Sequence, residues 1–321
     1  QGSTECNVGV FYPLFHYHDA ALGREELVLG YLDETDAPLN EFVSKSYCPE
    51  RELHGTKFVI RQQVSLGHNL IANGYYYIHF NEESLLNARI SGGKLVMGQA
   101  GLEVLILSHT EKLSLAAARK LQEISGAGIP VMFIGRLPEQ QPGYLGYKTH
   151  DEQIKRIVKE IAAKYGGFIQ LDDNPGGFIK NNLGIMPGIL FEGEDPNIQY
   201  IHKKTDSSDF YFLRSNTRTG RQARVKFPQN GKTPYILDPW TGKKEEAAWY
   251  FEKDGYVHMT LHFSVYSSII IEFRNTSCGV HAIESPIELH RSGNVMTGYG
   301  EDKGEYRFIL SDGSEKAISF S

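Results

Sequence analysis

The sequence has little of several features that would place it in a specialised class of protein. Its three cysteines, Cys6, Cys48 and Cys278, form no CxxC pair, so we expect neither a zinc site nor a disulfide scaffold, and at most one bridge could form. No stretch approaches the roughly 20 apolar residues of a membrane span, so no membrane partner is expected. The net charge is only -6 and the basic residues are scattered, which argues against a nucleic-acid partner.

The sequence also lacks the nucleotide-binding and nucleophile motifs of common α/β enzymes. No GxGxxG follows the apolar run 8–12, and no GxxxxGK[ST] occurs, so we expect no nucleotide and no other cofactor. No GxSxG is present, and Leu107 precedes Ser-His-Thr-Glu where a class I amidotransferase would carry a G-x-C-x-G elbow. A small α/β hydrolase or amidotransferase-like enzyme is therefore the weakest of the hypotheses considered.

The first half of the chain alternates buried strands with helices. Apolar or aromatic strands are expected at 7–12, 75–80, 102–107, 129–135 and 167–171. Helices are expected at 55–73, 81–88, 113–126 and 151–166. This alternation indicates a doubly wound parallel sheet, and we predict a flavodoxin-like α/β domain over residues 1–175.

The pattern changes after the Gly- and Pro-containing segment 172–177, which we interpret as a linker. Short strands with alternating polar and apolar residues are expected at 199–202, 209–215, 222–227, 235–237, 247–252, 256–263 and 267–273. They predict an antiparallel β-sandwich over residues 176–275. Residues 276–321 form a β-rich tail that either completes the sandwich or starts a further domain.

Polar side chains follow several strands of the predicted parallel sheet. In such a sheet ligands bind outside the carboxyl ends of the strands. This rule selects five candidate substrate-binding residues, listed in chain order: His79, Asn81, Glu82, His109 and Arg136. The alternative is structural, because strand ends are polar in every α/β protein and acidic side chains also favour the N-terminus of a helix.

Two other groups of side chains could form a metal site or a catalytic pair. His16, His18 and Asp19 lie close enough in sequence to suggest a metal site, but no second ligand cluster accompanies them, so a surface loop is favoured and no metal is expected. Asp172 and Asp173 are adjacent carboxylates, yet nothing in their spacing identifies the acid and base of a glycosidase. We assign no catalytic residue.

Several segments, in order, resemble a known enzyme family. They are Cys6-Asn7-Val8-Gly9-Val10-Phe11-Tyr12-Pro13, the run GYYYIHFNEESLL at 74–86, Gly93-Lys94-Leu95, 102–107, 128–138, Tyr200-Ile201-His202-Lys203, Asp209-Phe210-Tyr211-Phe212 and Asp238-Pro239-Trp240-Thr241-Gly242. Together they are similar to the region that follows the catalytic barrel in glycoside hydrolase family 106 α-L-rhamnosidases. The chain departs from the family pattern at Lys203, where arginine is expected, and residues 31–52 have no counterpart.

The resemblance implies a secreted or periplasmic glycoside hydrolase that acts on α-L-rhamnose or related sugar linkages in polysaccharides. In such enzymes the acid and base carboxylates lie on a barrel before this region, so the chain would be a C-terminal accessory part. Its expected partners are carbohydrate and the catalytic barrel, in the same enzyme or on another chain. The alternative is a non-catalytic carbohydrate-binding or scaffold protein.

Overall fold

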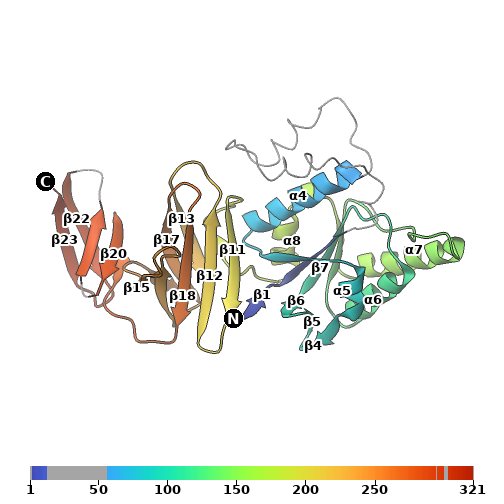
Figure 1. Cartoon of the computed structure of the whole chain (residues 1–321), viewed down its shortest axis with the longest axis horizontal. Helices are drawn as coiled ribbons and strands as arrows, with labels where there is room; N and C mark the ends of the chain where they lie inside the picture. The colour runs from blue at the N-terminus through green and yellow to red at the C-terminus, as the bar shows by residue number, and fades with distance from the viewer. Residues whose placement is uncertain (1, 13–55, 294, 300–302, 321) are drawn as a thin grey trace, which may run out of the picture. The chain divides into compact units, whose positions relative to one another are not determined.

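The computed structural model describes residues 2–12, 56–293, 295–299 and 303–320 (Figure 1). The metal hypothesis at 16–19, the unmatched segment 31–52 and Cys48 lie outside these residues. Contacts divide the chain into two compact units: an α/β unit, Cys6–Pro187, and a β unit, Gly188–Ser321 together with Gln1–Glu5. The expected combination of an α/β part with an all-β part is therefore confirmed.

The α/β unit is built on a five-stranded sheet in the order β3-β2-β7-β8-β9. Its strands are β2 (Val8–Phe11), β3 (Tyr77–Phe80), β7 (Val104–Ser108), β8 (Val131–Ile134) and β9 (Phe168–Ile169). Every neighbouring pair is parallel. Because helices cover both faces of a parallel sheet, its central strands β2, β7 and β8 are buried along their whole length.

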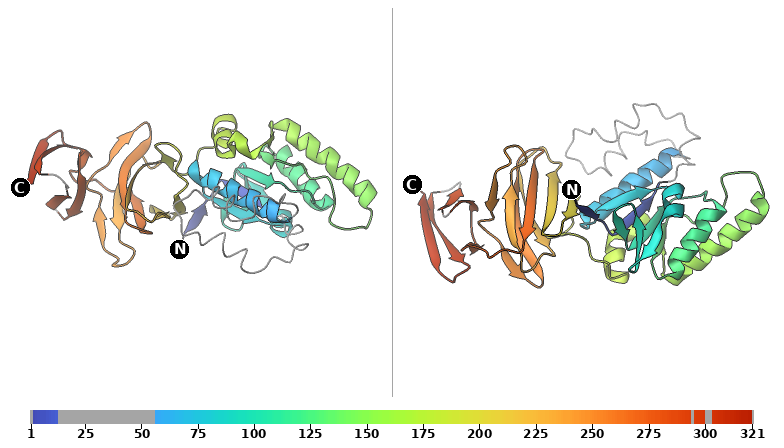
Figure 2. Two further views of the ribbon diagram at one scale, coloured as in Figure 1. Left: turned by 90° about the horizontal axis from the view of Figure 1, so that it is seen from above. Right: turned by 60° about the horizontal axis from the view of Figure 1, so that its bottom comes forward.

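Helices cover both faces of this sheet (Figure 2). They are α4 (Thr56–Ala72), α5 (Glu82–Asn87), α6 (Leu115–Gly126), α7 (Tyr147–Lys164) and α8 (Pro175–Asn182). One core contains Leu121 of α6 and Ile157 of α7, and the other contains Leu66 of α4 and Ile179 of α8. A small antiparallel sheet of β4 (Arg89–Ser91), β5 (Lys94–Met97) and β6 (Ala100–Leu102) precedes β7.

The segment interpreted as a linker is instead structured. Residues Leu171–Asp173 form the short 3-10 helix η1, and α8 follows it directly. Asn174 has a φ of 53° and caps α8, accepting a hydrogen bond from the backbone N–H of Gly177 at 3.0 Å. Its Oδ1 also accepts from the side chains of Asn69 and Asn73, both at 3.0 Å. The linker interpretation was wrong because this amide cluster holds the Pro-Gly-Gly start of α8 against α4.

The β unit contains two main antiparallel sheets (Figure 1). The six-stranded sheet has the order β1 (Ser3–Glu5), β11 (Ile198–Lys204), β12 (Ser208–Ser215), β18 (Ser268–Arg274), β14 (Thr233–Leu237), β15 (Lys244–Glu246). The four-stranded sheet has the order β10 (Leu190–Phe191), β13 (Arg221–Phe227), β17 (Tyr256–Phe263), β16 (Phe251–Lys253). The strand predicted at 247–252 is wrong for residues 247–250, which connect β15 to β16.

Aromatic rings join the inner faces of the two sheets. Tyr211 of β12 lies 4.9 Å from Phe227 of β13 between ring centroids, and Phe227 lies 5.1 Å from Phe273 of β18. All three side chains are fully buried. The two sheets therefore contact each other through buried aromatic side chains.

A buried charge cluster lies beside this core. Asp209 is almost completely buried, and its carboxylate accepts a hydrogen bond from His202 Nε2 at 2.7 Å and forms an ion pair with Lys232. Burial alone would raise the pKa of Asp209, but the hydrogen bonds from His202 and Lys232 outweigh it and lower that pKa to about 2. The His202 ring also stacks on Tyr211 at 4.1 Å, which joins the cluster to the aromatic core.

The ends of the chain differ from the predicted domain bounds. Residues Ser3–Glu5, expected in the α/β domain, form β1 and pair with β11 of the β unit. At the other end, β19 (Ala282–Glu284), β22 (Gly304–Leu310) and β23 (Glu315–Phe320) form a three-stranded sheet, and β20 (Glu288–Ser292) and β21 (Val295–Tyr299) form a hairpin. Both belong to the β unit.

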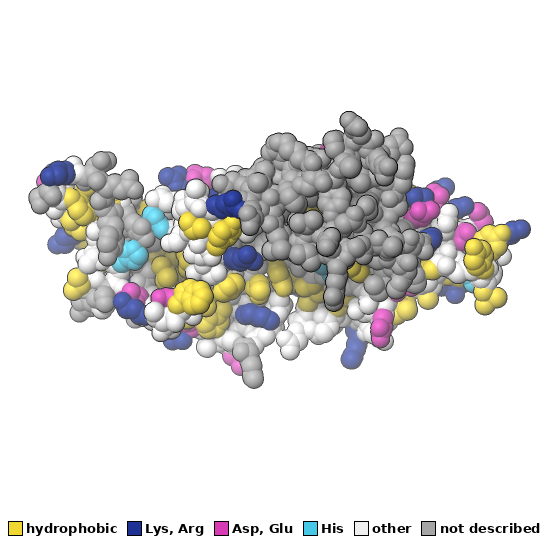
Figure 3. Space-filling view, turned by 45° about the horizontal axis from the view of Figure 1, so that its top comes forward, with side chains coloured by type: hydrophobic (Ala, Val, Ile, Leu, Met, Phe, Trp, Pro, Cys, Tyr) yellow, Lys and Arg dark blue, Asp and Glu magenta, His cyan; other side chains and the backbone are white. Residues whose placement is uncertain are grey.

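The described surface and cysteines agree with an ordinary globular chain. Figure 3 shows Lys and Arg side chains interspersed with Asp and Glu on the part of one face that it describes. Among the described helices, none is long and apolar enough to cross a membrane. Cys6 and Cys278 are both free thiols. Cys6 is buried, and this burial raises its pKa to about 11.

Replacing Asp209 tests the buried cluster. D209N keeps the shape but removes the charge facing Lys232, so we expect the free energy of unfolding at neutral pH to fall by about 2–3 kcal/mol. The native pKa lies below that of the unfolded chain, so the carboxylate stabilises the fold above about pH 4 and this stabilisation is lost as the pH falls towards 2. Urea unfolding of both proteins across this range should show the difference shrinking with acid. D206N, at an exposed carboxylate of the same hairpin, is the control and should change little.

Candidate functional site

The carboxyl ends of the parallel strands meet at one edge of the α/β unit. Phe11 of β2 pairs with Phe80 of β3, and Ser108 of β7 pairs with Ile134 of β8. The five candidate substrate-binding residues lie at or just after the ends of these strands, so the sheet brings them to a common edge. Their contacts determine which of them remain available to a ligand.

His79 lies at this edge on the outermost strand, β3. Its side chain is exposed, and its ring contacts those of Tyr12 and Tyr77 edge-on, with centroid distances of 5.8 Å and 5.4 Å. Tyr77 and His79 are two residues apart on one strand and therefore share a face. The three rings form a small aromatic group in which Tyr12 and His79 are exposed and Tyr77 packs partly against the core.

Asn81 and Glu82 have structural roles in this edge. Asn81 Oδ1 accepts from the backbone N–H of Ser84 at 2.9 Å and caps α5. Glu82 Oε1 accepts from the backbone N–H of Ser114 at 2.8 Å, and Ser114 in turn caps α6. Glu82 therefore joins the start of one helix to the start of the next, as the structural alternative in the sequence analysis anticipated.

His109 occupies the centre of the edge in a constrained conformation. Its φ is 50°, its Nδ1 lies 3.0 Å from Ser108 Oγ, and its backbone N–H donates to Ile134 O at 2.8 Å. The ring packs directly on Gly135, where a Cβ would lie only 2.1 Å from His109 Nε2. Burial lowers the pKa of His109 to about 4, so the imidazole is neutral at neutral pH. It can exchange hydrogen bonds there but carries no charge.

Arg136 stands next to Gly135 and is held by an ion pair. Its Nη1 lies 2.9 Å from Glu111 Oε2, on the loop that follows β7. Both side chains remain partly exposed, so the pair contributes little to stability but fixes the direction of the guanidinium. The remaining nitrogen donors of Arg136 can still face a ligand.

Sequence reasoning missed Gln63 at the same edge. This α4 side chain is buried, and its Nε2 donates to Ser108 O at 3.2 Å. Its Oε1 has no hydrogen-bond partner among the described residues. A polar residue on the sheet-facing side of a predicted helix was the only signal that could have identified it.

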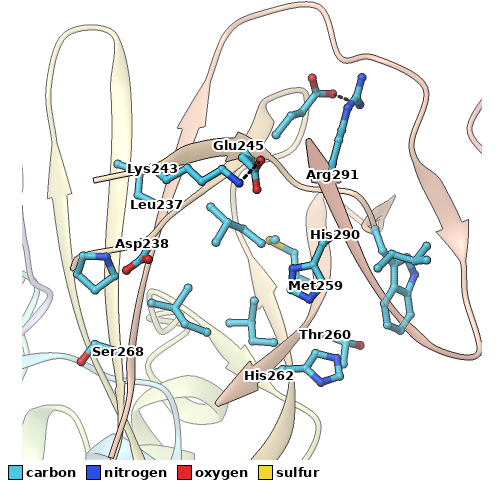
Figure 4. Close-up of a pocket in the computed structure, with 17 residues that line it drawn as sticks. Leu237, Asp238, Lys243, Glu245, Met259, Thr260, His262, Ser268, His290 and Arg291 are labelled. Carbon is cyan, nitrogen blue, oxygen red and sulfur yellow. Dashed lines mark hydrogen bonds and ion pairs between the residues drawn. The ribbon is translucent and has the colours of Figure 1, made fainter. Parts of the chain in front are cut away.

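Sequence reasoning also missed a cavity of about 380 Å³ in the β unit (Figure 4). Its lining comes from β14, β15, β17, β18, β20 and the β14–β15 turn. The lining combines apolar residues with carboxylates, imidazoles and an indole, including Asp238, Glu245, Trp249, Met259 and His290. No motif marks it, because its walls come from segments far apart in sequence. The described residues contain no group of three or more His, Cys, Asp or Glu side chains that could hold a metal ion.

The model of the family described as alpha-L-rhamnosidase, glycoside hydrolase family 106, matches residues 56–251. The chain belongs to this family. The resemblance given by the sequence segments is thereby confirmed, and a role related to glycoside hydrolysis is supported.

Two relatives of this family 106 chain are much longer than the chain itself. A curated protein of Formosa agariphila named "Putative beta-glucuronidase" is 26% identical over 245 residues, which cover 75% of this chain and 21% of that protein. The solved structure of a rhamnosidase from Novosphingobium sp. PP1Y matches with a TM-score of 0.58 and 16% identity, covering 96% of this chain and 29% of that one. The chain thus spans less than a third of the length of either relative, and the structural likeness concerns the fold alone.

A side chain at Gly135 should disturb the edge. In G135A the new Cβ meets the His109 ring, and the φ of 71° is one that alanine rarely adopts. We expect the free energy of unfolding to fall by about 2 kcal/mol, measured by urea denaturation. G126A, where a Cβ meets nothing within 4 Å and φ is not positive, is the matched control and should be neutral or slightly stabilising. Equal effects of the two substitutions would contradict the packing described.

The partly buried imidazole of His109 should also make the stability of the fold depend on pH in acid. Its native pKa is about 4, whereas an unfolded histidine titrates near 6.5, so the unfolded chain binds the proton first. Stability should therefore decline as the pH falls from about 6.5 to 4, by up to about 2–3 kcal/mol. H109N tolerates the positive φ but has no titrating ring, so it should flatten this part of the pH dependence. NMR titration of the imidazole measures its pKa directly, and an ordinary value would contradict the burial.

Proposed function

We propose that this chain is the C-terminal accessory part of a secreted or periplasmic glycoside hydrolase acting on α-L-rhamnose or related sugar linkages in polysaccharides. The family match supports the proposal most strongly, because residues 56–251 run through both units. The matched relatives are more than three times longer than the aligned chain. We therefore assign the catalytic barrel to another part of the same enzyme or to a partner chain.

The contacts of the carboxylates at the sheet edge favour support over catalysis. Glycoside hydrolysis needs two carboxyl groups about 5–9.5 Å apart on either side of the bond that is cleaved. Glu82 is engaged by the backbone of Ser114, and Glu111 by the guanidinium of Arg136. Neither is presented as a free acid or base, so we assign the acid and base to the barrel.

The strand order supports the finer fold assignment. Counted along the chain, the parallel strands of the α/β unit have the order 2-1-3-4-5, which is the flavodoxin-like order. We assign a flavodoxin-like domain to Cys6–Pro187 and a β-sandwich to the β unit. In this assignment the N-terminal strand β1 belongs to the β-sandwich, because it pairs with β11. The chain then enters the flavodoxin-like domain at β2, the next strand in the sequence.

The five candidate substrate-binding residues divide into two groups under this proposal. Asn81 caps α5, and Glu82 accepts a hydrogen bond from Ser114, the N-cap residue of α6. His79, His109 and Arg136 retain polar atoms that could bind sugar hydroxyls at the margin of a substrate-binding surface. A non-catalytic carbohydrate-binding protein is the second candidate function, and the mixed polar and apolar cavity of the β unit favours it.

Hydrolysis of 4-nitrophenyl α-L-rhamnopyranoside tests the accessory role. We expect no turnover by the 321-residue chain alone, and turnover by the polypeptide encoded by the longer reading frame. Deleting 6–321 from that polypeptide should reduce its activity or its thermal stability, because an accessory region supports the barrel. Turnover by the chain alone would contradict the proposal, and so would a reading frame with no upstream continuation. The second outcome would favour the binding protein.

A further inference from the structure

The cavity in the β unit has opposing walls from distant segments (Figure 4). Asp238 and Lys243 come from the β14–β15 turn, and His290 and Arg291 come from β20. Figure 4 shows these two pairs on opposite sides, with Met259 of β17 between them. The volume of about 380 Å³ lies within the range of small-molecule sites, about 300–1,000 Å³.

The floor and walls differ in chemistry. The floor is apolar and includes buried Met259 and Leu261 together with the half-buried indole of Trp249. The rim carries hydroxyl, imidazole and carboxylate groups from Thr260, His290 and Asp238. A pyranose ring has the matching arrangement, with C–H groups on its faces and hydroxyls around its circumference, so it can contact the indole and exchange hydrogen bonds at the rim together.

The turn that forms one wall is held rigidly. Asp238 Oδ1 accepts from the backbone N–H of Trp240 and Oδ2 accepts from Thr241 Oγ1, both at 2.8 Å. The backbone N–H of Asp238 donates to Lys243 O at 2.9 Å, which closes the turn. Trp240 at its tip is 92% exposed and does not line the cavity. A wall that is already held in place loses little conformational freedom when a ligand binds.

The charges of the lining select among saccharides. Lys243 is paired with Glu245 at 2.9 Å, and Arg291 is paired with Glu246 at 3.1 Å. Asp238 adds a third carboxylate, and its hydrogen bonds to the turn keep its pKa low, so the lining carries an excess of negative charge. Both cations already face carboxylates, so a uronate or sulfated sugar would be repelled rather than neutralised.

We propose that the cavity between the β14–β15 turn and β20 is a binding site for a neutral saccharide, with Trp249 as the aromatic contact and His290 as a hydrogen-bonding group. This inference rests on the proposed function in so far as family membership indicates carbohydrate as the ligand class. The site is separate from the edge of the parallel sheet, because all of its lining belongs to the β unit. Asp238 Oδ atoms have lone pairs left to accept sugar hydroxyls.

The tryptophans provide a direct measurement. The sequence has only two, Trp240 and Trp249, and Trp249 lines the cavity, so in W240F the intrinsic tryptophan fluorescence reports on this site. W240F is titrated with the methyl glycosides of L-rhamnose, D-galactose, D-glucose and D-mannose, and with sodium methyl β-D-glucuronide. We expect a saturable change with at least one neutral glycoside, and binding of the glucuronide at least about tenfold weaker.

Two variants and a matched control locate the binding. H290A removes an exposed side chain of the lining, and W249F replaces the half-buried indole of the lining by a smaller ring, so the fold should persist in both. Each should weaken binding of the neutral glycoside about tenfold by calorimetry. Y144A removes an aromatic side chain that is 94% exposed in the α/β unit and should leave the affinity unchanged. Circular dichroism of each variant checks that the fold is retained.

Each outcome supports or overturns the assignment. No saturable signal with any neutral glycoside overturns it, as does tighter binding of the glucuronide or unchanged affinity in both W249F and H290A. The measurement involves no hydrolysis, so a failure here leaves the proposed accessory role untouched. Conversely, loss of that role in the rhamnoside assay would not alter a binding constant measured on this chain.

Discussion

The β unit depends on an ionised carboxylate buried beside its aromatic core. Asp209 on β12 is bound by His202 from β11 and by Lys232 from the segment before β14, so one charge ties together three parts of the six-stranded sheet. Removing a partner from such a pair leaves an uncompensated charge in a poorly solvated place. The stack of His202 on Tyr211 extends this constraint to the rings that join the two sheets.

In the α/β unit, polar side chains at the ends of the parallel strands also stabilise the fold. Asn81, Glu82 and Ser114 satisfy the unpaired N–H groups at the starts of α5 and α6. The same strand ends would bind a ligand in a catalytic member of this fold class. Here most of that polar capacity serves the architecture, and His79, His109 and Arg136 remain at the margin. This agrees with a region that supports chemistry carried out elsewhere.

The sequence predicted those helices and strands whose periodic pattern of apolar residues was sufficient to identify them. In β17 the buried residues Val257, Met259, Leu261 and Phe263 alternate with less buried ones, so period two identified the strand and its inner face. Helix α8 was missed because Pro175 and its two following glycines signal a turn, while the cap by Asn174 and burial of Ile179 depend on tertiary contacts. The hydrogen bond from Ser114 to Glu82 could not be predicted, because the two residues are 32 positions apart in the sequence. The cavity was missed because β14, β17 and β20 meet only in the folded chain.

Cys6 shows how burial controls reactivity at the start of the parallel sheet. Its thiol donates weakly to Val8 O and Tyr76 O, and its pKa of about 11 leaves only about one molecule in ten thousand as thiolate at neutral pH. Thiol–disulfide exchange requires the thiolate and access to it. Burial and the raised pKa therefore both disfavour oxidation of this thiol.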